Sequence, residues 1–263
     1  MFKRELKINL KNFIIWTSII IAIFLVVFLV YPSIINSDNM KNIDEMMEMF
    51  PEEVLNVFNM DISSIDSAFG WLKTEGFTFV LLITGIYGGI LGSSILLKEE
   101  NDKTIEYLNS VPVTRTKIVI NKTLCGIIYI ILMVLAVGIF NFIGLSLSGD
   151  FDKKAYILLS ITPMFSSLVM FSLCLFLSTF THKTKKTLGI SLGIVFLSYF
   201  LNVISELSKE TEIFKYFSIF TLADIRNVIL DTKINPIMIV ITFVLSIILV
   251  SLTLFRYNKK ELV

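Results

Sequence analysis

Few side chains of this sequence could carry out chemistry by themselves. His182 is the only histidine, which excludes a metal site built from several histidines. Cys125 and Cys174 both fall within apolar runs, so neither a disulfide framework nor a zinc site is expected. Glu99 and Glu100 could suggest the glutamate pair of an intramembrane protease, but the membrane-embedded histidines that would accompany it are missing. Because the sequence holds no G-x-x-x-x-G-K-[ST] phosphate loop, we expect the chain to bind no cofactor and to hydrolyse no ATP itself.

The charges gather instead in one stretch. Lys98–Lys122, KEENDKTIEYLNSVPVTRTKIVINK, holds nine charged residues among 25. The runs on either side of it, 77–97 and 123–147, hold none. A segment of this kind between two apolar runs must face water, and its density of charge favours contact with a specific partner.

The rest of the chain indicates a membrane protein. Of 263 residues, 55% are hydrophobic and only 17% are charged, which leaves too little polar surface for a soluble domain of this length. The net charge of +1 gives no indication of a nucleic-acid partner. We predict a single all-α membrane domain, 1–263, in the lipid bilayer, because only helices satisfy their own backbone in lipid. Six segments are long enough to span: 13–35, 77–97, 123–148, 156–180, 187–205 and 236–255.

The distribution of Lys and Arg predicts the orientation of these spans. With the N-terminus inside, 15 of the 23 basic residues fall on the inner side, including five in 98–122. The positive-inside rule therefore places both termini and the 98–122 segment in the cytoplasm. We expect a multi-pass protein of a bacterial plasma membrane.

Three segments outside the spans have patterns of their own. In 2–12, the basic residues and the apolar residues occupy different helical faces, which predicts an interfacial helix at the cytoplasmic surface. The long outer loop 36–73 predicts one or two short amphipathic helices. The apolar outer segment 206–235 predicts a re-entrant or interfacial hairpin, in which Thr221 and Asp224 resemble a capped helix start.

The spans themselves hold no Asp, Glu, Lys, Arg or His in their interiors. Ion-driven carriers usually keep such residues near the middle of the membrane, so any uphill transport here should draw its energy from outside the membrane. Three G-x-x-x-G pairs predict close helix packing, either within the chain or between two copies. They are formed by Gly85 and Gly89, Gly88 and Gly92, and Gly189 and Gly193.

Within the charged stretch, the pattern predicts a short helical knob. A helix continuing past Lys98 would place Ile105, Leu108 and Val111 on one side. Pro112 would end that helix, and Thr114 is placed to cap the next one. Such a knob is rigid enough to transmit a push from a docked protein.

This stretch resembles the segment between the second and third spans of the permeases of ATP-binding-cassette type-2 exporters. Members of that family typically show paired acids, a Gly-Thr, a Glu, a Ser-x-Pro-Val-[ST]-Arg turn and a downstream Lys. Lys103 departs from the pattern, since Gly is common at its position. The matching residues are Glu99, Glu100, Thr104, Glu106, Ser110, Pro112, Val113, Thr114, Arg115 and Lys122.

The resemblance implies a permease subunit of an ATP-driven exporter. Two copies of the permease would pair, each holding a separate ATPase subunit through a coupling helix in 98–122, with ATP and Mg bound by the ATPase. The exported substrate would be amphipathic or hydrophobic, such as a peptide, an antimicrobial compound or a lipid. Two alternatives remain open at this point: a stand-alone carrier or channel, and a membrane sensor or assembly subunit.

Overall fold

The computed structural model describes residues 2–34, 67–105, 113–208 and 210–261. Within these ranges every regular element is a helix and there is no strand. Six helical segments are long and apolar enough to cross a membrane, which confirms the predicted all-α membrane fold. They are Phe2–Val30, Phe77–Ile95, Arg115–Ser148, Lys153–Ser178, Thr184–Leu207 and Pro236–Lys259.

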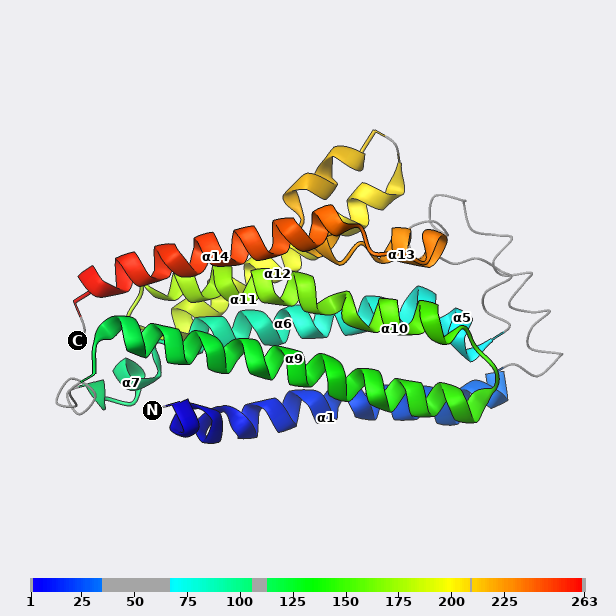
Figure 1. Cartoon of the computed structure of the whole chain (residues 1–263), viewed down its shortest axis with the longest axis horizontal. Helices are drawn as coiled ribbons and strands as arrows, with labels where there is room; N and C mark the ends of the chain where they lie inside the picture. Colours follow the sequence, from blue (N-terminus) through cyan, green and yellow to red (C-terminus); the bar gives the residue numbers. More distant parts are fainter. Residues whose placement is uncertain (1, 35–66, 106–112, 209, 262–263) are drawn as a thin grey trace.

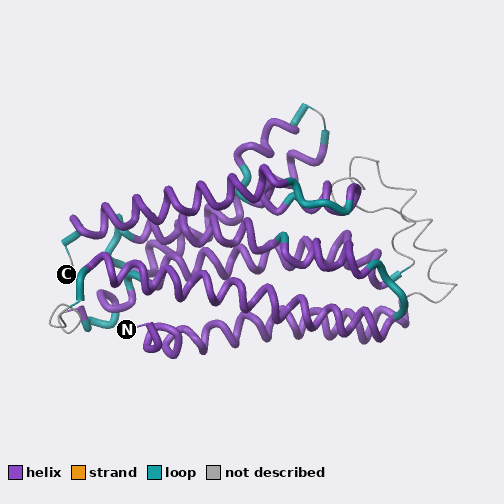
Figure 2. Tube along the Cα trace, viewed as in Figure 1, coloured by secondary structure: helices purple, strands orange, loops and turns teal. Residues whose placement is uncertain are grey.

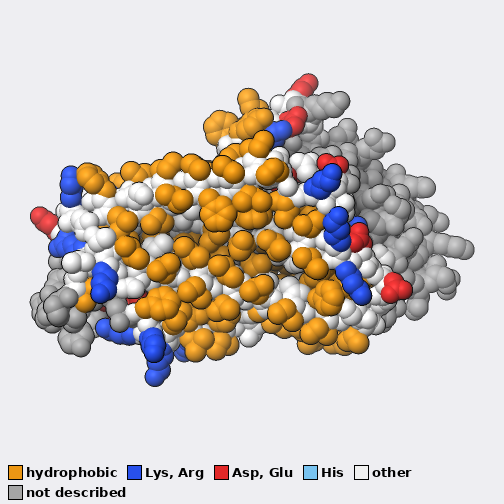
Figure 3. Space-filling model, in the orientation of Figure 1, with side chains coloured by type: hydrophobic (Ala, Val, Ile, Leu, Met, Phe, Trp, Pro, Cys, Tyr) orange, Lys and Arg blue, Asp and Glu red, His pale blue; other side chains and the backbone are white. Residues whose placement is uncertain are grey.

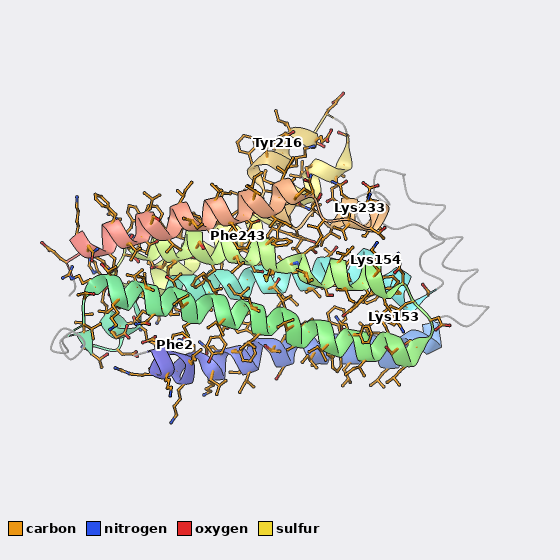
Figure 4. The ribbon with its side chains drawn as sticks, in the orientation of Figure 1. Phe2, Lys153, Lys154, Tyr216, Lys233 and Phe243 are labelled. Atoms are coloured by element: carbon orange, nitrogen blue, oxygen red, sulfur yellow. The ribbon has the colours of Figure 1, made fainter. Side chains whose placement is uncertain are left out.

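The spanning helices lie side by side along the long axis of the molecule (Figure 1). Both termini and the short helix α7 (Lys98–Asn101) lie at one end, which we call the terminal end. The opposite, distal end carries α5 (Ala68–Trp71) and α13 (Ile225–Asp231). Most loops lie at these two ends, and others belong to the segment between α12 and α13, which projects from the side of the bundle (Figure 2). Lys153, Lys154 and Lys233 mark the distal end, far from Phe2 (Figure 4). An apolar belt separates the charged ends (Figure 3), as expected of a surface that meets lipid.

The centre of the bundle is formed by α6 (Phe77–Ile95) and α11 (Pro163–Ser178). In the most apolar stretch of α6, 61% of the residues are buried inside the chain. In the corresponding stretch of α14 (Pro236–Lys259), only 11% are buried. A Cβ atom at Gly88 would lie 2.8 Å from the carbonyl oxygen of Ser167, and one at Gly92 only 2.4 Å from that of Phe171. Only glycine therefore allows these two backbones to approach so closely.

The N-terminal segment forms one uninterrupted helix, α1 (Phe2–Ile34). Residues 2–12 are helical as predicted, and they run without a break into the predicted span 13–35. The two faces are also separated: Phe2, Leu6 and Phe13 pack against the core, whereas the basic residues are exposed. Those exposed basic residues are Lys3, Arg4, Lys7 and Lys11.

The fourth predicted span, 156–180, is not a single helix. It is divided into α10 (Lys153–Ile161) and α11 at Thr162. Pro163 has no N–H to continue the helix of α10, and its ring suits the first position of a new one. At this break the N–H of Phe165 donates to the Thr162 carbonyl at 3.1 Å, an i to i−3 bond in place of the helical i to i−4.

The helix predicted to continue past Lys98 ends sooner than expected. α7 contains four residues, and Lys103 then adopts a left-handed backbone with φ of 54°. A left-handed backbone favours glycine. Glycine is also common at this position in the exporter permeases that this stretch resembles. Pro112 and Val111, where the predicted helix would have ended, lie outside the described residues. α9 (Arg115–Ser148) begins eight residues before the predicted span 123–148.

The remaining elements lie close to their predicted ranges. α12 (Thr184–Leu207) and α14 cover the predicted spans 187–205 and 236–255. Between them, the distal hairpin (210–235) holds the 3₁₀ turns η2 (Glu212–Phe217) and η3 (Phe220–Ala223) followed by α13. The predicted capping by Thr221 is wrong, because its hydroxyl bonds the carbonyl of Lys215 instead and the helix begins only at Ile225. Of the outer loop 36–73, the structure describes 67–73, which form α5 and the start of the π-helical turn η1 (Leu72–Gly76).

Candidate functional site

At the terminal end, a buried lysine joins its own helix to three other elements of the bundle. Lys122 on α9 has no exposed side-chain surface, and its Nζ lies 2.9 Å from both carboxylate oxygens of Glu99. The same ammonium donates to Glu5 Oε2 of α1 at 3.2 Å and to the carbonyl of Ile95, in the last turn of α6, at 2.6 Å. A charge in this position is tolerable only because each of its protons meets an acceptor.

The neighbouring carboxylate reaches to the other side of the bundle. Glu100 Oε1 accepts from Lys260 Nζ at 2.7 Å, and its Oε2 lies 2.8 Å from His182 Nδ1. Lys260 also donates to the carbonyl of Thr181, so the chain after α14 is tied to the turn between α11 and α12. Burial lowers the pKa of Lys260, and the hydrogen bond that it donates to Glu100 opposes that shift.

Arg115 makes a third connection, between the start of α9 and the end of α14. Its Nη1 donates to the carbonyls of Lys260 at 2.6 Å, of Asn258 at 3.2 Å and of Tyr257 at 3.4 Å. The last carbonyls of a helix have no partner within the helix and carry its negative dipole end, so a guanidinium is well matched to them. The first turn of α9 is held as well, because Thr114 caps it by accepting from the N–H of Lys117, as predicted.

These contacts make a single unit, which we call the terminal network: Glu5, Glu99, Glu100, Arg115, Lys122, His182 and Lys260. The two adjacent acids of α7 point to different partners, because consecutive residues in a helical turn are about 100° apart. Glu99 is thereby linked to α1, α6 and α9, and Glu100 to the end of α14 and to the α11–α12 turn. A short segment between two spans is thus joined to nearly every helix of the bundle.

The other residues predicted for this site differ in exposure, and several lie outside the described residues. Thr104 is exposed, with its N–H bonded to the carbonyl of Glu99 at 2.9 Å, and Val113 is partly buried against the core. Glu106, Leu108, Ser110 and Pro112 lie outside the described residues.

The glycines divide into two groups. Gly88 and Gly92 approach the backbone of α11, as described above. A Cβ at Gly85 would lie 2.6 Å from the Phe220 ring, and one at Gly89 would lie 3.1 Å from Val195. A Cβ atom at Gly189 or Gly193 would have no atom from another element of the described residues within 4 Å, so within that part of the chain neither glycine packs against a neighbouring helix.

Sequence reasoning missed three members of the terminal network: Glu5, His182 as a partner of Glu100, and Lys260. A signal for Glu5 was present, since at 100° per residue Glu5 and Asn9 lie on the apolar face that carries Phe2 and Phe13. A carboxylate on such a face predicts a buried cation opposite it. Lys260 and His182 carried no comparable signal, because their partner lies far away in the sequence.

Comparison with known proteins agrees with the resemblance noted above. The model of a family described as ABC-2 family transporter protein matches residues 1–262, nearly the whole chain. A search of curated proteins found none with significant similarity to this chain.

Proposed function

Because the chain belongs to the ABC-2 family of transporter proteins and is therefore a membrane permease subunit, we propose that it is the permease subunit of an ATP-driven exporter. In this proposal, the 98–115 segment receives movement from a separate ATPase subunit and passes it to the spans. The observation that carries the proposal is the terminal network, which joins this one short segment to α1, α9, α14 and the α11–α12 turn through buried charges.

The network is suited to transmitting force. Breaking a buried ion pair by separating its partners costs about 3–5 kcal/mol. A displacement of α7 would therefore carry its partner helices with it rather than tear Glu99 from Lys122 or Glu100 from Lys260. A push of a few ångströms at this segment would move several spans together, which is what switching between two access states needs.

The orientation follows from the same positions. We propose that the terminal end lies in the cytoplasm, where the ATPase and its ATP are found. The N-terminal basic residues, α7, the basic start of α12 (Lys183, Lys185 and Lys186) and the C-terminal basic residues all lie at this end, and the positive-inside rule assigns such an end to the cytoplasm.

The complete exporter would contain more than this chain. We propose two copies of the permease and two ATPase subunits, with ATP and Mg held by the ATPases and none by this chain. The apolar spans favour an amphipathic or hydrophobic substrate. The exposed Gly189 and Gly193 on α12 would allow close approach of the second copy.

The test is to co-express the chain with an ATP-binding-cassette ATPase subunit from the same source and to purify the permease. We expect an active ATPase to co-purify, whereas the permease alone shows no turnover. Asp102→Arg and Thr104→Arg change exposed side chains next to α7 without touching the terminal network, and they should weaken co-purification.

The matched control is Asp150→Arg, which reverses an exposed charge at the distal end. It should leave the complex intact. Equal co-purification of all three variants and wild type would contradict the docking of the ATPase at this segment.

A further inference from the structure

A cavity of about 470 Å³ opens at the terminal end between α11 and α14, bordered by His182 and Lys260 of the terminal network. Its walls are apolar, while basic side chains stand at the end nearest the chain terminus. The apolar residues are Phe176, Phe180, Leu252 and Phe255, and the basic ones that the terminal network does not use are Arg256 and Lys259.

The two basic side chains are held in position by aromatic rings. The guanidinium carbon of Arg256 lies 3.7 Å from the centroid of the Phe180 ring, and Lys259 Nζ lies 4.0 Å from that of Phe255. Such cation–π contacts orient a cation without neutralising its charge. In the described part of the chain neither residue forms an ion pair with a carboxylate, although Glu261 also lines the cavity.

The cavity lies where the apolar belt ends. Phe180, Leu252 and Phe255 are 51%, 43% and 63% exposed, so their apolar surfaces are accessible to a lipid chain. One turn further along α14, the side chains become basic. A ligand that fits must therefore be apolar on the membrane side and anionic at the water side, which is the chemistry of an anionic phospholipid.

An anion at the end of α14 would ordinarily be repelled by the negative end of the helix dipole. Here Arg115 already covers the carbonyls of Tyr257, Asn258 and Lys260. The charges of Arg256 and Lys259 consequently remain available to an anion from outside the chain.

We propose that this cavity binds an anionic phospholipid, with the phosphate held by Arg256 and Lys259 and an acyl chain lying against Phe180, Leu252 and Phe255. Binding of a lipid in this cavity needs neither ATP nor an ATPase. Its failure would therefore leave the proposed transport function untouched.

The test is native mass spectrometry of the purified chain titrated with phosphatidylglycerol or with phosphatidylcholine. Arg256→Ala/Lys259→Ala should weaken phosphatidylglycerol binding by about 30-fold, since each basic residue near an anionic surface is worth a factor of about five. The matched control, Lys7→Ala/Lys11→Ala, removes the same charge from exposed positions on α1 at the same end. It should change the affinity by about twofold at most, because charges outside a pocket act only at a distance.

Three outcomes would overturn the proposal. Equal weakening in the two double variants would show general attraction by charge and no site. Equally tight binding of phosphatidylcholine would show that the anionic headgroup is not recognised. Displacement of phosphatidylglycerol by glycerol 3-phosphate at similar concentration would show a site for free phosphate compounds in place of a lipid.

Discussion

The two ends of the bundle are held together by different kinds of interaction. At the terminal end, full charges are buried: Lys122 meets Glu5 and Glu99, and Glu100 meets Lys260. These pairs join segments that are far apart in the sequence, up to 160 residues in the case of Glu100 and Lys260. The ends of the spans are thereby fixed to one another.

At the distal end, the hairpin is attached to α12 through neutral groups. The Ser218 hydroxyl donates to the carbonyl of Ser198 at 2.7 Å, and the Ser198 hydroxyl accepts from the N–H of Ile219 at 2.8 Å. Beside them, a polar cavity of about 190 Å³ separates the hairpin from α6 and α12. Asp224 lines this cavity, and burial raises the pKa of its carboxyl.

The difference shows which end should move as a unit and which should rearrange. A neutral hydrogen bond contributes about 1 kcal/mol net, whereas a buried charge that loses its partner costs about 3–5 kcal/mol. We expect the terminal network to stay intact while the bundle switches, and the distal hairpin to open locally. Each of the following predictions measures one side of this comparison.

The largest effect should come from Lys122→Met. The substitution leaves Glu5 and Glu99 buried beside each other without their cation, at a cost of about 3–5 kcal/mol of folding free energy. We expect a large loss of folded protein and a much lower melting temperature in detergent. Lys117→Met, at an exposed position of the same helix, is the control and should melt like wild type.

The same site offers a rescue. Adding Glu5→Gln and Glu99→Gln to Lys122→Met replaces the buried carboxylates with neutral amides, which removes the uncompensated charge. The triple variant should therefore recover most of the lost melting temperature. If it stays as unstable as Lys122→Met, packing of the lysine and not its charge holds this end together.

Glu100→Gln should have the next largest effect. It removes the carboxylate from Lys260 and His182, and charged hydrogen bonds of this kind contribute about 1.5–3 kcal/mol. The loss should be smaller than at Lys122 because the glutamine carbonyl oxygen can still accept from the buried Lys260, and because half of the His182 side chain is open to water. Denaturant unfolding of this variant beside Lys122→Met gives the order of the two costs, and the reverse order would contradict the assignment of Lys122 as the centre.

Lys260 also predicts a dependence on pH. Burial lowers its pKa in the folded protein, below the usual value of about 10.4. Between the lowered pKa and 10.4 the unfolded chain binds more protons, so the contribution of this residue to stability rises with pH. Glu100→Gln removes the carboxylate that opposes the shift, so the rise should begin at lower pH than in wild type. Melting temperatures recorded from pH 7 to 10 measure this rise in stability. In Lys260→Met the rise should be absent.

The positions of the spans could be predicted from sequence because they depend on local composition. A run of about 20 apolar residues must be a helix in lipid wherever its neighbours lie. The errors occurred where a single residue decides the backbone. Pro163 divides the fourth span, and the turn at Lys103 ends α7 after four residues.

The terminal network could be predicted only in part. The acids Glu99 and Glu100 and the basic residues Arg115 and Lys122 were found through a motif within one stretch. Their partners could not be found in this way, because Lys260 comes from the other end of the chain. Pairing over such distances is set by how the helices pack, and the sequence pattern of one segment holds no information on it.

Arg115→Ala should have a smaller and more local effect. It frees the carbonyls at the end of α14, with an expected cost of about 1 kcal/mol, because water can satisfy groups at a partly exposed helix end. Hydrogen exchange should quicken in the last turn of α14 and remain unchanged in α6. Lys117→Ala, two residues along on α9, is the control and should leave exchange in α14 as in wild type.

The smallest effect should come from Ser198→Ala at the distal end. The substitution removes the acceptor of the Ile219 N–H, but the Ser218 hydroxyl can still donate to the Ser198 carbonyl, so the cost should be about 1 kcal/mol or less. Limited proteolysis should then cut the hairpin faster while the melting temperature of the bundle hardly changes. Ser146→Ala removes an exposed hydroxyl that bonds only within α9, and it should alter neither measurement. A fall in melting temperature as large as that of Lys122→Met would mean that the distal hairpin is as rigidly held as the terminal network, and the division between a rigid end and an adaptable end would no longer stand.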